Sequence, residues 1–320
     1  MMFYKQMCQV RKQKVAIRLL NATMAVSYLA IQMETISTEL VHRLSSAVER
    51  MPAFPNGVQA ILKLTRDINC QPKDLVAVIE KDPVIAVKIL RIINSAYYNV
   101  GNKISSINQS VVYLGINTVK NLALNISIVG MLPKQNAAGF DTQHYLMHAL
   151  LTASLTEQLG NRYAEGEVAG NDCYIAGLLH NFGKVVFAQF LPEQFLAATT
   201  FAAERQAPLF LAERKIIGAD HALVGAMLAQ HWQFPDALVE CISSHHTAPD
   251  QSVLGECLFA ADLIGETLGF DACSNRKPEQ ALPALPARFG DSLEALMQSL
   301  PTLTKIVDEA RQFSQSEGTA

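Results

Sequence analysis

An apolar helical run ends on a polar pair in the stretch Ile175-Ala176-Gly177-Leu178-Leu179-His180-Asn181-Phe182-Gly183-Lys184. Two polar side chains at the closing end of such a helix must find partners in the interior or face a cleft. A lone histidine in this setting is more often a hydrogen-bonded core residue than a ligand. The pair therefore becomes informative only if further polar residues recur in the same setting along the chain.

Five other polar side chains do recur at the ends of apolar helical segments or within them, namely His148, His221, His245, His246 and Asp262. Neutral imidazoles and carboxylates together are a ligand set with which proteins hold divalent cations, and such ions generate hydroxide and neutralise phosphate. With His180 and Asn181, these residues predict a site of the kind that cleaves phosphate esters. At position 181, however, the chain has an amide where such a site needs a charged carboxylate.

Asn181 leaves two readings of this set open. An amide coordinates through its oxygen, but it carries no charge and bridges metals poorly. Asn is nearly isosteric with Asp, so packing survives while metal chemistry is weakened. The polar residues can instead form a satisfied buried network, which specifies a fold without doing chemistry. The sequence favours the network over a catalytic metal. Binding of a divalent ion (Fe, Mn or Mg) without catalysis stays open, because five histidines are enough for a transition metal.

Composition sets the broad class of the protein. The chain has 320 residues, of which 50% are hydrophobic and 17% charged, with a net charge of -3. This indicates a folded chain with a rich core, and it argues against broad electrostatic binding to nucleic acid. The six cysteines are far apart with no C-x-x-C pair, which is typical of reduced thiols and predicts a cytoplasmic protein. No segment reaches transmembrane length, so no membrane partner is expected.

Nearly every periodic segment is helical, and no pair of alternating runs is joined by a hairpin turn, so the sequence predicts an all-α fold. Helices are expected over 37–49, 58–66, 72–80, 83–95, 108–114, 118–129, 143–159, 172–180, 192–205, 209–216, 221–231, 235–246, 253–268 and 292–313. Gly183 is expected to form the turn that closes the 172–180 helix. The polar stretch 133–140 predicts a break between two lobes, 37–132 and 141–270, of one domain spanning 37–270. Residues 271–320 are expected to form a loop and a helical tail.

The N-terminal extension, 1–36, is the one compositional oddity. Its first twenty residues are basic and without an acid, and a mostly apolar run, 19–31, follows. This resembles the basic and apolar regions of a signal peptide. Asn21 and Ser27 interrupt the run, however, and it is too short to span a bilayer. The alternative is that translation starts at Met24 or Met33.

The motif 177–184 resembles the signature of HD-superfamily proteins, in which His-Asp is usual and Gly-Lys or Gly-Arg follows. The first lobe resembles a narrower group, the HDOD domain (HD-related output domain), through Met51-Pro52-Ala53-Phe54-Pro55, Asp82-Pro83-Val84, the stretch 90–98 and the stretch 107–115. The second lobe adds the stretch 220–226 and Ile242-Ser243-Ser244-His245-His246. The resemblance covers about residues 40 to 270.

This resemblance implies a two-lobed all-α fold and a regulatory output role in bacterial signal transduction, without demonstrated catalysis. In the catalytic HD relatives, one metal would be held by the residues matching His148, His180, position 181 and Asp262. A second would be completed by those matching His221, His245 and His246. Lys184 would contact substrate phosphate.

Two departures separate this chain from cyclic-dinucleotide phosphodiesterases of that superfamily. Asn181 replaces the usual Asp, and Thr247 follows the paired histidines where those enzymes carry Glu, with no Gly-Tyr-Pro afterwards. We therefore expect a non-catalytic signalling adaptor that works through protein partners. The rival hypothesis is a metal-dependent phosphohydrolase acting on a nucleotide or another phosphate ester. A nucleic-acid binder is disfavoured by charge, and the partner and the oligomeric state are left open.

Overall fold

The computed structural model describes residues 36–53, 56–66, 71–95, 98, 100–101, 103–133, 137–246, 252–270 and 284–317. Within these ranges the chain forms helices, without any strand beyond an isolated bridge between Glu165 and Val168. The predicted all-α fold is therefore confirmed. None of the helices in the described part has the length and apolarity needed to cross a membrane. The predicted N-terminal extension, apart from Ile36, lies outside the described residues, as does Thr247.

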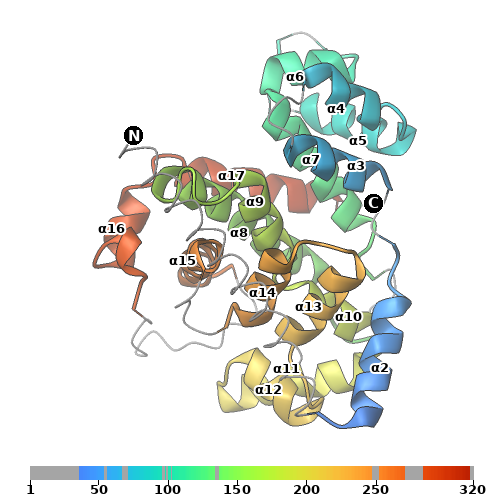
Figure 1. Ribbon diagram of the computed structural model, residues 1–320, viewed down its shortest axis with the longest axis vertical. Helices are drawn as coiled ribbons and strands as arrows, with labels where there is room; N and C mark the ends of the chain where they lie inside the picture. The colour runs from blue at the N-terminus through green and yellow to red at the C-terminus, as the bar shows by residue number, and fades with distance from the viewer. Residues whose placement is uncertain are drawn as a thin grey trace, which may run out of the picture.

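The first lobe is a group of helices that stands apart at the top of Figure 1. It comprises α3 (Asn56–Arg66), α4 (Pro72–Ile79), α5 (Pro83–Ile93), α6 (Ile107–Leu114) and α7 (Ile116–Val129). Asp82 caps α5 by accepting hydrogen bonds from the backbone N–H groups of Val84 and Ile85, both at 3.1 Å. Gly115 separates α6 from α7 with a φ of 84°, a conformation that glycine adopts without strain. Both boundaries were expected from the sequence.

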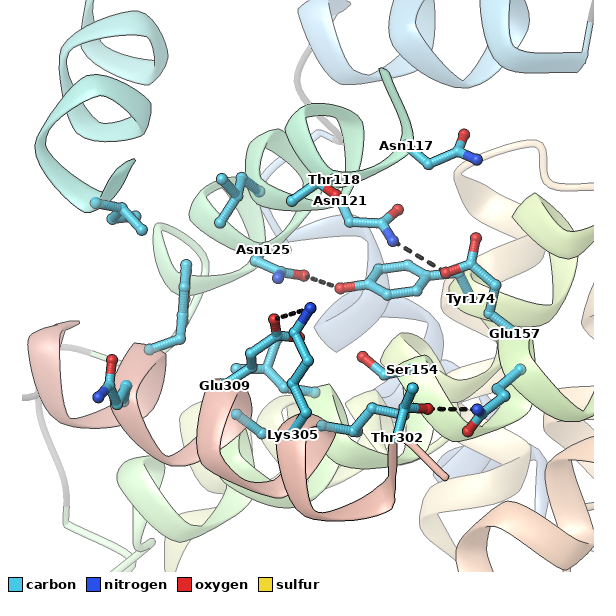
Figure 2. Close-up of a pocket in the computed structure, with 18 of the residues that line it drawn as sticks. Asn117, Thr118, Asn121, Asn125, Ser154, Glu157, Tyr174, Thr302, Lys305 and Glu309 are labelled. Carbon is cyan, nitrogen blue, oxygen red and sulfur yellow. Dashed lines mark hydrogen bonds and ion pairs between the residues drawn. The ribbon is translucent and has the colours of Figure 1, made fainter. Parts of the chain in front are cut away.

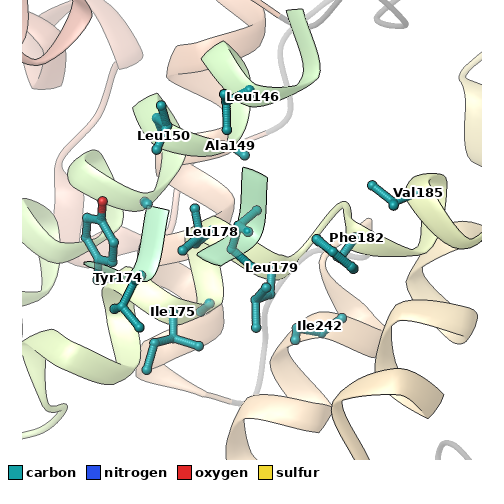
Figure 3. Packing of buried hydrophobic residues seen from close by; sticks show 14 of the residues in the cluster. Leu146, Ala149, Leu150, Tyr174, Ile175, Leu178, Leu179, Phe182, Val185 and Ile242 are labelled. Atoms are coloured by element: carbon teal, nitrogen blue, oxygen red, sulfur yellow. The ribbon is translucent and has the colours of Figure 1, made fainter. Parts of the chain in front are cut away.

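The second lobe is built around the longest helix, α8 (Thr142–Tyr163), which packs along α9 and α15. The other helices are α9 (Gly170–Leu179), α10 (Phe182–Phe190), α11 (Pro192–Arg205), α12 (Leu209–Ile216), α13 (His221–His231), α14 (Asp236–Ser244) and α15 (Val253–Thr267). Figure 3 shows part of the core formed by α8, α9 and α10, to which they contribute the buried side chains of Leu150, Leu178 and Phe182. This core fixes the helix ends that carry the polar cluster.

Helices from both ends of the chain complete the second lobe. Helix α2 (Thr38–Glu49) packs on α10 and α13 rather than on α3–α7. The packing thus joins α2 to the second lobe, although the sequence predicted a first lobe beginning at residue 37. The expected helical region 292–313 is two helices, α16 (Leu293–Gln298) and α17 (Leu303–Glu317). Because α17 packs along α8, the C-terminal helix is part of the folded body.

The prediction that Gly183 closes a helix as a turn is wrong. Gly183 lies inside α10, a helix that the sequence analysis did not expect. A Cβ atom at position 183 would lie 2.0 Å from the carbonyl oxygen of His221 and 2.9 Å from the backbone nitrogen of Gly225. Glycine is therefore needed for the close approach of α10 to α13, and not for an unusual backbone angle. The apolar run after Gly183, from Val185 to Phe187, was the overlooked signal for a second helix.

Candidate metal centre

The polar cluster forms where several helix ends meet in the second lobe. His180 and Asn181 occupy the corner between the end of α9 and the start of α10. His221 is the first residue of α13, whose N-cap Asp220 accepts a hydrogen bond from the Leu223 N–H at 2.9 Å. His245 is the C-cap of α14, followed directly by His246. His148 and Asp262 reach the same region from within α8 and α15.

His148, His180 and Asp262 form the first of two groups. The Nε2 atoms of His148 and His180 are 3.2 Å apart. The Oδ1 atom of Asp262 lies 3.0 Å from His148 Nε2 and 3.3 Å from His180 Nε2. Atoms that share one divalent ion at about 2.0–2.2 Å stand roughly 3.0–3.5 Å from one another. The triangle therefore has the dimensions of one face of a coordination shell.

A hydrogen bond from Nδ1 of the His180 ring orients the ring so that the lone pair of Nε2 faces this triangle. Its Nδ1–H donates to the Gly177 carbonyl oxygen at 2.7 Å, because a carbonyl can only accept. In the neutral ring Nε2 is then unprotonated, which is the form that binds metal. Burial lowers the pKa of His180 and so favours the neutral ring. Burial alone would raise the pKa of Asp262, but the facing His148 and His180 lower it well below its usual value.

Asn181 contributes a buried oxygen that lacks a partner. The residue is 3% exposed, and its Oδ1 accepts no hydrogen bond from any described group. Its side chain also makes no capping hydrogen bond to α10, although Asn181 is the N-cap residue. Leaving such an acceptor unsatisfied costs about 1–3 kcal/mol. The Oδ1 atom of Asp262, by contrast, faces the Nε2 atoms of both His148 and His180. The unpartnered oxygen of Asn181 leaves the polar network incomplete, which a closed structural network would not, and the triangle of His148, His180 and Asp262 has the dimensions of a cation site.

His221, His245 and His246 form the second group. The Nε2 atoms of His221 and His246 are 2.8 Å apart. His245 donates from Nδ1 to the Ile242 carbonyl at 2.7 Å, and its Nε2 is buried without a described partner. The carboxylate of Glu213 contacts the ring of His221 on its Nδ1 side, opposite Nε2. The Glu213 Oε2 atom lies 2.6 Å from His221 Nδ1, and it also accepts the backbone N–H of His221 at 2.9 Å. A carboxylate behind a histidine fixes the ring so that Nε2 points forward.

The electrostatics of the second group oppose added positive charge. Burial, together with the nearby charge of Lys184, lowers the pKa of His221 well below its usual value. Burial also lowers the pKa of His245 to about 3. Lys184 itself is only 5% exposed. Among the described residues, no carboxylate joins the three imidazoles as a direct ligand. The second group therefore consists of three neutral imidazoles beside the buried side chain of Lys184.

Ring contacts join the two groups into one cluster. The His180 and His245 ring centroids are 5.1 Å apart, and those of His221 and His245 are 5.5 Å apart. Six of the predicted site residues thus lie together, in the two groups that the resemblance implies, while the placement of the Asn181 side chain in the first group and the role of all of them as ligands stay predictions. The sequence analysis missed Glu213 and Phe210, whose ring stacks on His246 at 4.4 Å. Neither residue stands out in the sequence, because both lie on α12, whose other charged side chains, Arg214 and Lys215, are exposed.

Comparison with known proteins gives one family and a set of related folds. The family model of the HDOD domain matches residues 51–248. A curated relative from Treponema pallidum (strain Nichols), described only as an uncharacterized protein, is 28% identical over 220 residues, which is 68% of this chain. The match spans 42% of that relative, so the relative is much longer.

Solved structures share the fold. An HDOD domain protein of unknown function from Geobacter sulfurreducens has a TM-score of 0.67 at 19% identity, covering 90% of this chain and 96% of its own. A candidate signal transduction protein from Marinobacter aquaeolei VT8 has a TM-score of 0.71 at 23% identity, covering 87% and 66%. A candidate phosphohydrolase from Shewanella amazonensis SB2B has a TM-score of 0.62 at 22% identity, covering 85% and 97%. These identities support a shared fold and nothing finer.

Proposed function

This chain belongs to the HDOD domain family, and from that premise we propose that it is a non-catalytic regulator in signal transduction that acts through protein partners. The observation that carries the proposal is the buried, uncharged side-chain oxygen of Asn181, the residue after His180, which accepts no hydrogen bond from any described group. It favours one structural divalent ion over the bimetallic centre of a phosphohydrolase.

The charge balance supports one ion rather than two. Asp262 is the one described carboxylate that approaches the imidazoles as a direct ligand in either group. Two divalent ions would bring four positive charges into this buried cluster, where Asp262 and Glu213 are the described carboxylates that contact the imidazoles. Burying more positive charge than these two carboxylates offset is costly. A carboxylate at position 181 could bridge two ions with its two oxygens, whereas an amide offers one neutral oxygen.

His148, His180, Asn181 and Asp262 are the residues that would hold the ion. A bound divalent cation supplies the charge that polarises a coordinated water or a phosphate oxygen. The chain's own residues orient the imidazoles through the Gly177 carbonyl and through Glu213, and they exclude solvent. The mixed imidazole and oxygen donors favour Fe or Mn over Mg, because Mg prefers oxygen ligands.

Burial of the predicted phosphate contact further disfavours a phosphohydrolase. Lys184 is 5% exposed and His180 is fully buried, whereas the Asp262 side chain is 16% exposed. A phosphate ester would have to displace packed side chains to reach the lysine.

Protein partners are supported by apolar side chains on the surface of the first lobe. Val84 and Val87 on α5 are 67% and 64% exposed, and Val112 and Tyr113 on α6 are 80% and 55% exposed. The two helices pack against each other. Exposed large apolar side chains on helices that pack together are what a protein-binding surface in this lobe would require.

A turnover assay tests the absence of catalysis. With excess Mn²⁺ or Fe²⁺, we expect no significant hydrolysis of cyclic-di-GMP or of bis(p-nitrophenyl) phosphate, because the amide weakens the metal site. The matched control is His180→Ala, which removes a ligand. Robust turnover by the wild type that disappears in His180→Ala would establish the rival phosphohydrolase instead.

A further inference from the structure

Helix α5 presents an apolar stripe to solvent. Its residues Val84 and Val87 are 67% and 64% exposed, and Arg91 in its last turn is exposed as well. Spacings of three, four and seven residues place side chains on one side of a helix, so these three residues share a face. A second cation, Lys81, is exposed just before the N-cap of α5. The α5 stripe is thus two valines with a cation at each end of the helix.

Helix α11 of the second lobe presents the matching pattern with the opposite charge. Leu196 is 45% exposed, and Ala197 and Thr200 are exposed on the same side of the helix. Glu193 and Glu204 are exposed at the two ends of this row. The spacing from residue 193 through 196, 197 and 200 to 204 is again three and four residues. The α11 stripe is thus a largely apolar centre with a carboxylate at each end.

The two stripes also agree in length. Helix α5 has eleven residues and is therefore about 16 Å long. Glu193 and Glu204 are eleven residues apart, which again corresponds to about 16 Å along α11. In Figure 1, α5 belongs to the helices at the top of the molecule and α11 to those at the bottom. The two stripes therefore do not meet within one molecule, and a contact between them needs two copies.

The charged ends of both stripes have no ion-pair partner among the described residues. Arg91 lines the interlobe cavity, a space of about 890 Å³ between the two lobes, together with the acids Glu157 and Glu309. Figure 2 shows that both acids are engaged by other groups. The Asn121 amide donates to Glu157 at 3.1 Å, and Lys305 lies 3.7 Å from Glu309. An acid for Arg91 must therefore come from another molecule.

The two lobes carry opposite charge. Residues 56–132, which contain the first lobe, have eight Lys and Arg against four Asp and Glu, whereas residues 133–270 have six against fifteen. Two of the four acids in the first lobe are used locally, since Asp74 accepts the Gln71 N–H at 3.1 Å and Asp82 caps α5. The first lobe therefore attracts an acidic surface that the second lobe repels. The second lobe of another copy is such a surface.

We propose that the α5 stripe of one molecule docks on the α11 stripe of a second copy of this chain. The valines of α5 pack against Leu196, and the cations at the two ends of α5 pair with Glu193 and Glu204. A nucleic acid fits the α5 stripe less well, because its phosphates contact the cations and leave the valines exposed. Two copies that exchange both contacts form a closed pair, and single contacts form a head-to-tail chain.

One helix pair makes a small interface, so the association is weak and reversible. It covers Val84 and Val87, which the proposed function assigns to a surface for protein partners. A partner and a second copy then compete for α5, and self-association limits how much of the regulator is available. This consequence rests on the proposed function, whereas the docking of the two stripes does not.

Sedimentation of the full chain tests the proposal first. Between about 5 and 500 µM protein, a range that suits a weak interface, the average mass is expected to rise from that of a monomer toward that of a dimer or a longer chain. In about 1 M salt, which screens charges beyond roughly 3 Å, the association is expected to weaken. A monomer at every concentration would overturn the proposal.

Reversing the charges locates the contact. Lys81→Glu/Arg91→Glu makes the α5 stripe acidic, and Glu193→Arg/Glu204→Arg makes the α11 stripe basic. Each double variant alone brings like charges together and is expected to associate at least tenfold more weakly than the wild type. An equimolar mixture of the two variants pairs opposite charges again and is expected to regain association. Because misfolded chains would not recover on mixing, the mixture separates lost contact from lost structure.

Lys63→Glu/Lys73→Glu is the matched control. Both lysines are exposed in the first lobe but lie outside α5, so the change in charge is the same while the stripe is intact. Its association is expected to stay within about twofold of the wild type, because exposed charges farther apart than about 8 Å are largely screened at 0.15 M salt. Unchanged association in either charge-reversed variant, or no recovery in the mixture, would overturn the proposal. Neither result would bear on the turnover or the metal content of the histidine cluster.

Discussion

Gly183→Ala is expected to destabilise the protein more than any other single methyl addition at a described glycine. A Cβ atom there would lie 2.0 Å from the His221 carbonyl oxygen and 2.8 Å from its carbon. Both are backbone atoms of α13, so no side-chain rotation relieves the clash. The loss in unfolding free energy should be about 3 kcal/mol or more, at the upper end of overpacking effects. Urea unfolding followed by circular dichroism measures it as a lower midpoint.

Gly57→Ala is the matched control for this substitution. Gly57 is also helical, in α3, but a Cβ atom there would meet nothing within 4 Å. Alanine is the better helix former by about 1 kcal/mol, so the urea midpoint should stay the same or rise. An unchanged midpoint for Gly183→Ala would mean that α10 and α13 do not approach as closely as described, and that the corner holding His180 is shaped in another way.

Asn181→Asp is expected to make the stability of the protein depend strongly on metal. Without metal, the new carboxylate is a buried charge at a position whose oxygen has no described partner, and it should lower the unfolding free energy by about 1–3 kcal/mol. With Mn²⁺ it becomes a charged ligand in the first group, where the amide now offers a neutral oxygen. Binding at a hundredfold excess over Kd would return about 2.7 kcal/mol. Thermal melts with and without Mn²⁺ measure both effects.

Asn108→Asp controls for the change in charge. Asn108 is exposed in the first turn of α6, so its melting temperature should not respond to Mn²⁺. If Asn181→Asp melts at a lower temperature that Mn²⁺ does not restore, the cluster is a structural polar network. That outcome would agree with the satisfied buried network that the sequence favours.

The candidate ligands could be predicted from sequence because each lies at a conspicuous place, on or at the end of an apolar helix. His180 follows an apolar run, His245 lies at the end of α14, and Asp262 lies between Ala261 and Leu263 in the apolar middle of α15. The partners behind them could not be predicted. Glu213 contacts His221 through a chain reversal between α12 and α13, and nothing in its own helix marks it as buried. Long-range pairing of this kind depends on packing rather than on periodicity.

The packing of single helices was also only partly predictable. Helix α2 was found correctly as an amphipathic helix, but its apolar stripe does not reveal which lobe it covers. Gly183 was assigned to a turn because glycine ends many helices. Its real constraint is the backbone of α13, which is distant in sequence. The interlobe cavity is of the same kind, since residues of α7 and α8 that are distant in sequence, such as Asn121 and Gln158, line it together only in the folded chain.

Metal content tests the central claim most directly, namely that the cluster holds one ion and no catalytic pair. The full chain is purified without chelator and its Fe, Mn and Mg are measured by mass spectrometry per mole of protein. The charge balance predicts one divalent ion per chain, bound at the group of His148, His180 and Asp262 and lost in His180→Ala, and a metal-free wild type would contradict this. Two tightly bound ions per chain in the wild type would contradict it and would restore the case for a bimetallic phosphohydrolase.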